Sequence, residues 1–73
     1  MTIPSRSEVE RRRREYPAGT RVVLESMDDP QAPRVGSLGT VRGVDDLGQI
    51  MVSWDSGGSL SVILEAGDRI RRG

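Results

Sequence analysis

The sequence contains no cysteine and no histidine. Without cysteine there is neither a disulfide framework nor a thiolate metal site. Histidine is the commonest acid–base group near neutral pH and the commonest metal ligand, so its absence removes both roles. No serine therefore has a histidine that could activate it as a nucleophile. We expect a protein that is not an enzyme and that binds no metal and no cofactor.

Long apolar runs are also missing from the sequence. No run approaches the ~20 apolar residues that a helix needs to span a bilayer. The N-terminal residues 1–16 are rich in arginine and glutamate and lack the apolar core of a secretion signal. From these two absences we expect a cytoplasmic protein without a membrane partner.

Lysine is absent as well, since all 11 basic residues are arginines. The 11 acidic residues balance them overall but not locally. Residues 1–24 carry six arginines against three glutamates, residues 25–68 carry two arginines against eight carboxylates, and residues 69–73 add three arginines. A basic N-terminal arm and a basic C-terminal tip thus flank an acidic body. The absence of lysine along the whole chain favours a GC-rich codon bias over selection for arginine at one site.

The N-terminal arm has the signals of a short helix. Ser5 and Ser7 are each followed three residues later by a glutamate, and either pair fits a capping box. Pro17 disfavours the α conformation at the residue before it, so the helix is predicted over residues 5–15. A helix of this length is marginal alone in water and must dock or stay partly disordered.

The remainder of the 73-residue chain alternates apolar and polar side chains in short runs, as half-buried strands do. We divide the chain into residues 1–15, a tail with a basic helix, and residues 16–73, a β domain. The predicted fold class is mainly β: a five-stranded SH3-like small barrel with a short N-terminal α-helix. Its strands are expected at residues 21–24, 38–44, 49–54, 60–62 and 68–70. The predicted core consists of Val22, Leu24, Val41, Ile50, Val52, Trp54, Leu60, Val62 and Ile70.

Several turns can be assigned from their residue types. Gly43 suggests a β-bulge that returns the next valine to the core side, and Gly48 suits a positive φ in a hairpin loop. Residues 25–36 form a long loop. We predict that Asp28 or Asp29 accepts backbone hydrogen bonds inside this loop and keeps it ordered. A short 3₁₀ turn is expected within residues 63–67.

Three stretches carry a likeness to a known family: Tyr-Pro-Ala-Gly-Thr at residues 16–20, Met-Asp-Asp-Pro at 27–30 with Ala-Pro at 32–33, and Gly-Thr-Val through Val-Asp-Asp and Trp-Asp at 39–57. Over essentially its whole length the chain resembles small bacterial and phage-associated proteins catalogued as a domain of unknown function. The resemblance implies a compact β-barrel from a phage, a prophage or another mobile element. It implies no activity.

Five aspartates and the single tryptophan are the candidate partner-binding residues. The aspartates occupy three turns, where Asp is common because its carboxylate accepts nearby backbone N–H groups. Several carboxylates together also suit a hard cation, but their spacing matches no calcium loop. Trp54 is in phase with Ile50 and Val52, which favours the core, whereas an exposed ring would be a stacking platform. The candidate set is Asp28, Asp29, Asp45, Asp46, Trp54 and Asp55.

The arginines supply the alternative site, for nucleic acid. The run at residues 11–14 could contact phosphates, but the glutamates at 8, 10 and 15 can pair with it at helical spacing. These pairs favour a solvated helix face over phosphate binding, and a basic helix packed across the acidic body is a further alternative. The alternative set is Arg11, Arg12, Arg13, Arg14, Arg71 and Arg72.

The predicted function is that of a non-enzymatic phage or mobile-element accessory protein. It would bind another protein through the acidic face of the barrel and the loop at residues 25–36. One version is an inhibitor of a host system, whose acidic surface competes for a basic site. The alternative is a nucleic-acid-binding small barrel that uses the arginine-rich helix and the C-terminal tip.

Overall fold

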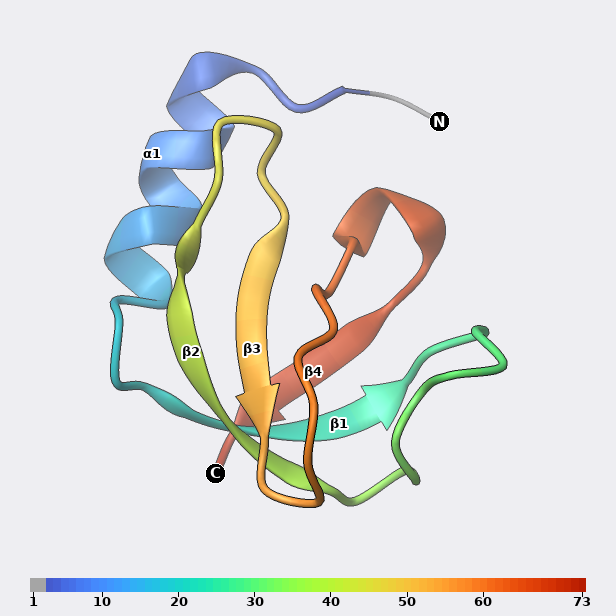
Figure 1. Cartoon of the computed structure of the whole chain (residues 1–73). Coiled ribbons are helices and arrows are strands. Elements are labelled where there is room, and N and C mark those ends of the chain that lie inside the picture. The colour runs from blue at the N-terminus through green and yellow to red at the C-terminus, as the bar shows by residue number, and fades with distance from the viewer. Residues whose placement is uncertain (1–2) are drawn as a thin grey trace.

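The computed structural model describes residues 3–73 and contains one α-helix, one 3₁₀ turn and four strands (Figure 1). The elements follow one another as α1 (Arg6–Glu15), β1 (Arg21–Ser26), β2 (Leu38–Val44), β3 (Ile50–Trp54), η1 (Leu64–Ala66) and β4 (Arg69–Arg72). The protein is therefore mainly β with a short N-terminal helix, as the sequence predicts. None of the described helices is long and apolar enough to cross a membrane.

The four strands form one antiparallel sheet in the order β3-β2-β1-β4. The predicted five-stranded SH3-like barrel is not supported, because among the described residues β3 and β4 lie at opposite edges and the sheet is open. Residues 60–62, expected as a strand, run beside β3 through isolated bridges only. The ladder is interrupted because the carbonyl of Leu60 accepts the indole N–H of Trp54, at 3.1 Å, and not a backbone N–H.

Helix α1 begins and ends where the local signals place its boundaries. Of the two candidate caps, Ser5 is the one used: its Oγ accepts the N–H of Glu8 at 3.2 Å. The helix ends at Glu15, and the N–H of Tyr16 still bonds to the carbonyl of Arg12 at 2.8 Å, just before Pro17.

Two glycines shape the β2–β3 hairpin as predicted. The register of the two strands shifts between Val41 and Gly43, which marks a bulge, and Val44 is returned to the buried side. Gly48 has a φ of +81°, and its N–H bonds to the carbonyl of Asp45 at 3.0 Å. A side chain at this position would be strained, which is why glycine suits the turn.

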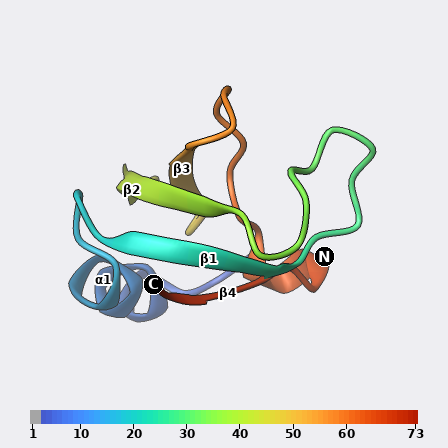
Figure 2. The ribbon, with the colours of Figure 1, turned by 90° about the horizontal axis from the view of Figure 1, so that it is seen from below.

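The core confirms eight of the nine predicted residues as buried, and the ninth, Leu60, packs partly buried against them. Val44 is buried as the bulge predicts, and Val9 and Val23 are also buried, although the sequence did not single them out as core. Val9 is 4% exposed and joins the main cluster, so the helix docks on the sheet and contributes to its core. Figure 2 shows α1 and β4 on the same side of β1.

Candidate functional site

A groove of about 440 Å³ runs between the β1–β2 loop (residues 27–37) and the segment that follows β3 (residues 58–63), and it extends to the turn after η1. Residues that lie far apart in the sequence meet there, because the lining comes from the start of the β1–β2 loop, from Gln49 before β3, from residues 59–63 and from the residues around η1. Its lining residues are Met27, Asp28, Asp29, Gln49, Ser59, Leu60, Ser61, Ile63, Ala66 and Asp68.

The groove combines an apolar floor with acidic walls. Met27, Leu60 and Ile63 are partly buried and supply the apolar contacts. Asp28, Asp29 and Asp68 supply three carboxylates, and no arginine is among the lining residues. A concave site with an apolar base and a few polar groups suits an extended ligand. The carboxylates favour a ligand that carries positive charge.

The β1–β2 loop is held in place by its own backbone and by one aspartate. The Oδ1 of Asp29 accepts the N–H of Gln31 at 2.8 Å, and its carbonyl accepts the N–H of Ala32 at 2.9 Å. The N–H of Gly36 reaches back to the carbonyl of Leu24 at 2.8 Å. The predicted loop-ordering role is thus confirmed for Asp29.

Asp28 differs from its neighbour. It is exposed, and it makes no hydrogen bond and no ion pair with any residue in 3–73. Because the loop is already held by Asp29, the carboxylate of Asp28 is left at the wall of the groove without a structural task.

Asp68 lines the groove beside η1 and is buried. Its Oδ2 accepts the N–H of Ile63 at 2.9 Å, which fixes the turn through η1. Arg69 donates to the carbonyls of Leu64 and Asp68 at 3.1 and 2.7 Å and supports the same turn from outside. The groove is therefore bounded on this side by a hydrogen-bonded turn.

The other predicted partner-binding aspartates lie elsewhere and serve the fold. Asp45 accepts the N–H groups of Leu47 and Gln49 at 3.0 and 2.8 Å and closes the β2–β3 hairpin. Asp46, at the same hairpin, pairs with Arg13 at 2.8 Å. The hairpin and the turn after β3 lie at opposite ends of the molecule in Figure 1. The structure brings only Asp28 and Asp29 of the predicted set together in the groove.

Asp55 follows β3 and is occupied by a two-point ion pair. Arg21 donates from Nη1 to Oδ1 at 2.8 Å and from Nη2 to Oδ2 at 2.5 Å. Arg21 also donates to the hydroxyl of Thr40 at 2.8 Å. These hydrogen bonds lower the pKa of Asp55 below its ordinary value. The pair joins β1 to the end of β3 on the surface.

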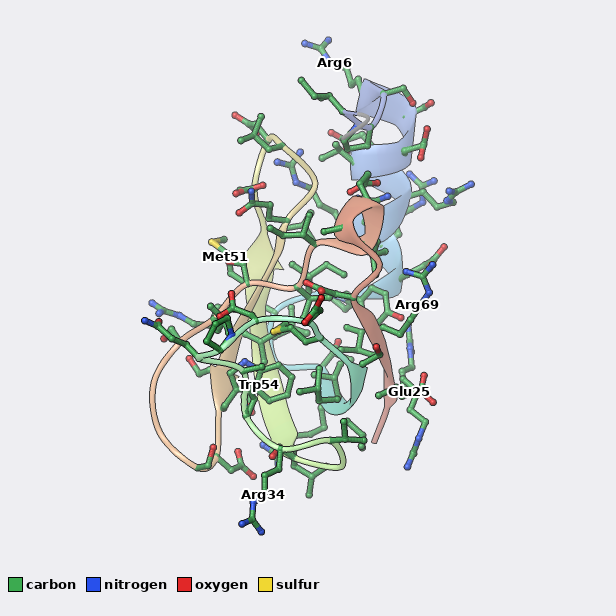
Figure 3. All side chains as sticks on the ribbon, turned by 90° about the vertical axis from the view of Figure 1, so that its right-hand side faces the viewer. Arg6, Glu25, Arg34, Met51, Trp54 and Arg69 are labelled. Atoms are coloured by element: carbon green, nitrogen blue, oxygen red, sulfur yellow. The ribbon has the colours of Figure 1, made fainter. Side chains whose placement is uncertain are left out.

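Trp54 is a core residue, which was one of the two interpretations of its position. It is 4% exposed, and its indole Nε1 donates to the carbonyl of Leu60. Figure 3 shows its ring within the body of the molecule, whereas Arg34 and Met51 project outward. Trp54 thus supports Leu60 from beneath the groove and presents no open face for stacking.

The arginine run of α1 is divided by the rotation of the helix. Arg12 is 7% exposed and donates to the carbonyl of Gly48 at 3.0 Å and to both carboxylate oxygens of Glu65. The hydrogen bonds from Arg12 lower the pKa of Glu65. The interpretation of the whole run as a solvated face is therefore wrong for Arg12, and the basic helix does pack across the β domain.

The remaining arginines of the nucleic-acid set are mixed. Arg13 donates to the carbonyl of Val44 at 3.1 Å in addition to its pair with Asp46. Arg11 lies 3.7 Å from Glu15, and Arg14 is exposed.

At the C-terminal tip, Arg71 lies 3.8 Å from Glu25. Arg72 donates to the carbonyl of Glu15 and stacks 5.9 Å from the ring of Tyr16. The tip is therefore packed against the end of α1 and does not extend from the domain as a separate basic arm.

Sequence reasoning missed most of the groove. Ser59, Ser61 and Asp68 were not singled out, although serines that alternate with Leu60 and Val62 indicate side chains that face away from the core. No comparable local signal marked Asp68.

Within residues 3–73 no group of three or more carboxylates gathers as a metal cluster would.

Comparison with known families finds a match over most of the chain. The model of a family described as a domain of unknown function, DUF4314, matches residues 5–72. The match covers α1, the four strands and all the residues that line the groove. No curated protein and no solved structure matches the chain.

Proposed function

The chain belongs to the DUF4314 family, a domain of unknown function, and we propose that it is a non-enzymatic protein-binding module. Its binding site is the groove between the β1–β2 loop and residues 58–63. The ligand is an extended segment of a partner protein that carries at least one basic side chain.

The observation that carries this proposal is the carboxylate of Asp28 beside an apolar floor. Most carboxylates of the described chain are engaged, by an arginine or by a backbone N–H, whereas Asp28 has neither. Met27 and Leu60 lie in the same groove and offer contacts to aliphatic side chains. A basic residue with an apolar neighbour would satisfy both features at once.

The expected strength of the charge contact is modest. An exposed ion pair contributes about 0.2–1 kcal/mol, and salt screens it with a Debye length of about 8 Å at physiological ionic strength. Asp29 adds negative charge to the same wall. The carboxylates therefore select for positive charge in the ligand. Most of the affinity comes from contacts with the apolar floor and from main-chain contacts of the extended ligand.

The nucleic-acid alternative has less support. Arg12 and Arg13 are committed to contacts inside the domain, and Arg72 is packed on Tyr16. A phosphate backbone would have to compete with those contacts. The phage or mobile-element origin stays a prediction from the resemblance in the sequence, and a role as an inhibitor of a host system stays a prediction from the acidic surface.

The test is a display selection of short random peptides on the immobilised protein, followed by titration of the selected peptides. We expect the selected peptides to be enriched in arginine or lysine. The double variant Asp28→Asn, Asp29→Asn should bind them about three- to tenfold more weakly, since two screened charge contacts are lost. Asparagine keeps the Oδ1 acceptor, so the bond from Gln31 and the shape of the loop are preserved.

Asp46→Asn is the matched control, because the Asp46 side chain is 98% exposed and is not among the residues that line the groove. It should bind the peptides as the wild type does. A selection that enriches no peptide, or peptides whose binding is insensitive to the Asp28 and Asp29 changes, would remove the proposed function.

A further inference from the structure

The backbone of residues 59–62 is paired on one side only. The N–H groups of Leu60 and Val62 donate to Val52 and Ile50 of β3 at 3.2 and 2.8 Å, and the N–H of Ile50 donates back to Val62 at 3.0 Å. Between them, neither the N–H nor the C=O of Ser59 or Ser61 has a hydrogen-bond partner within residues 3–73.

The direction of these unpaired groups follows from strand geometry. Successive N–H and C=O groups of an extended chain point alternately to its two sides. Since Leu60 and Val62 turn theirs toward β3, Ser59 and Ser61 turn theirs the opposite way. Both serines line the groove, so the free backbone edge belongs to the groove.

This edge lacks the protection that the other edge of the sheet has. β4 has three arginines among its four residues, and Arg72 is tied to the carbonyl of Glu15 in α1. Charged side chains and covering elements are the usual means of blocking an edge strand. Residues 59–62 contain neither a charged residue nor a proline. The edge is thus open to another strand.

We propose that the partner segment binds by strand addition along Ser59 and Ser61. This inference rests on the proposed function and specifies how that function is carried out. The added strand would exchange main-chain hydrogen bonds with the two serines, at the usual spacing of about 4.8 Å between strands. Its side chains would alternate between its two faces, so that those on one face contact the apolar floor and a basic one on the other face reaches the carboxylate of Asp28.

Main-chain hydrogen bonds do not depend on the partner's side chains. The edge therefore contributes affinity for any extended segment that lacks proline at the bonded positions. The floor and Asp28 contribute the choice among such segments. Peptides obtained by selection should accordingly share an alternating pattern with a basic residue and differ elsewhere.

The test uses a selected peptide and the pair Ser61→Pro and Ser61→Ala. Proline removes the outward N–H and places its ring at the edge, whereas alanine removes only the hydroxyl and keeps the N–H. We expect S61P to bind at least about tenfold more weakly than S61A, because one lost hydrogen bond alone corresponds to roughly threefold to tenfold. Fluorescence of Trp54 reports whether S61P is folded.

A measurement on the unmodified protein makes the test independent of that variant. In the complex with peptide, amide hydrogen exchange at Ser59 and Ser61 should slow by at least about tenfold, as expected of new ladder hydrogen bonds. The exposed amide of Ser56, in the turn after β3, is the internal control and should not change. Unchanged exchange at Ser59 and Ser61 in a saturated complex overturns strand addition.

The two proposals fail in different ways. If peptides bind, depend on Asp28 and still bind S61P with unchanged affinity, the groove function stands and strand addition is wrong. If no peptide binds the wild type, the proposed function is wrong, and the inference fails with it. If the free edge pairs with a second copy of the chain, light scattering will show a dimer that S61P abolishes. That result would overturn the proposal that the added strand comes from a partner protein.

Discussion

Replacing Arg12 by methionine should destabilise the fold strongly, although sequence position places Arg12 in a run of four equivalent arginines. The guanidinium is buried and donates to the carbonyl of Gly48 and to the carboxylate of Glu65. Removing one partner of a buried ion pair costs about 3–5 kcal/mol, because the other charge is left uncompensated. The Glu65 side chain is 14% exposed, so water can still reach its carboxylate. We therefore expect a loss of unfolding free energy at the lower end of this range, about 3 kcal/mol.

That loss is large for a domain of this size. A chain of 73 residues has an expected unfolding free energy of about 4–11 kcal/mol, at roughly 0.05–0.15 kcal/mol per residue. The assay is urea unfolding followed by the fluorescence of Trp54, the single tryptophan, which is buried in the native state. Arg11→Met is the matched control. Its side chain is 59% exposed on the same helix, so we expect a change within about 0.5 kcal/mol.

A double-mutant cycle with Glu65→Met separates the ion pair from simple loss of packing. Replacing both partners by apolar residues of similar volume is often nearly neutral. The double variant should therefore recover most of the stability that each single change removes. Additive losses in the double variant, or an R12M variant no less stable than R11M, would refute the reasoning.

The same pair should be visible in the pH dependence of stability. The Arg12 hydrogen bonds lower the pKa of Glu65 in the folded state, so its contribution is present above the ordinary glutamate pKa of about 4.3 and is lost as the pH falls through the folded value. The wild type should lose unfolding free energy below about pH 4.3 more steeply than the double variant does. Equal slopes would contradict the assignment.

Three further results are expected. Gly39→Ala should cost about 1–3 kcal/mol by overpacking, since a Cβ there would lie 2.6 Å from Cγ1 of Val52 and 2.7 Å from Cε3 of Trp54; an unchanged urea midpoint would contradict the close approach. Asp29→Ala should destabilise by about 1 kcal/mol through its lost acceptor bond while Asp29→Asn does not, and equal stability of the two variants would count against that bond. Duplex DNA and RNA should bind at or below the nonspecific level of about 10⁻⁴–10⁻⁶ M, and a titration at low and physiological salt should show little change when the exposed Arg11 and Arg14 become glutamine; submicromolar binding lost in that variant would favour the nucleic-acid alternative.

The features that the sequence determines are those in which the deciding residues are close neighbours along the chain. Ser5 caps the helix and Pro17 ends it because both act on backbone groups within one turn. Gly43 produces the bulge because its φ of +152° suits only glycine at that point of the strand. The alternation from Ile50 to Trp54 places its apolar side chains on one buried face because the side-chain period of a strand is two.

The number of strands and the openness of the sheet are decided at longer range. Residues 60–62 have the alternation of a strand, but the indole of Trp54 takes the carbonyl of Leu60 from the ladder. The carboxylate of Asp68 accepts the N–H of Ile63 and holds the chain after Val62 in the turn through η1. A pattern of apolar residues does not contain these side-chain competitors, which are in place only after the chain has folded. The predicted barrel failed for this reason.

The groove and the buried arginine also arise only in three dimensions. Four consecutive arginines look alike in sequence, and the docking of Val9 fixes the rotation of α1 that buries Arg12, three residues further on the same face. The groove joins Asp28 to Ser61 and Asp68, which lie more than thirty residues away in sequence. The sequence alone determined the local elements and the alternating core, whereas tertiary packing decided which polar groups the fold consumes and which it leaves open for a partner.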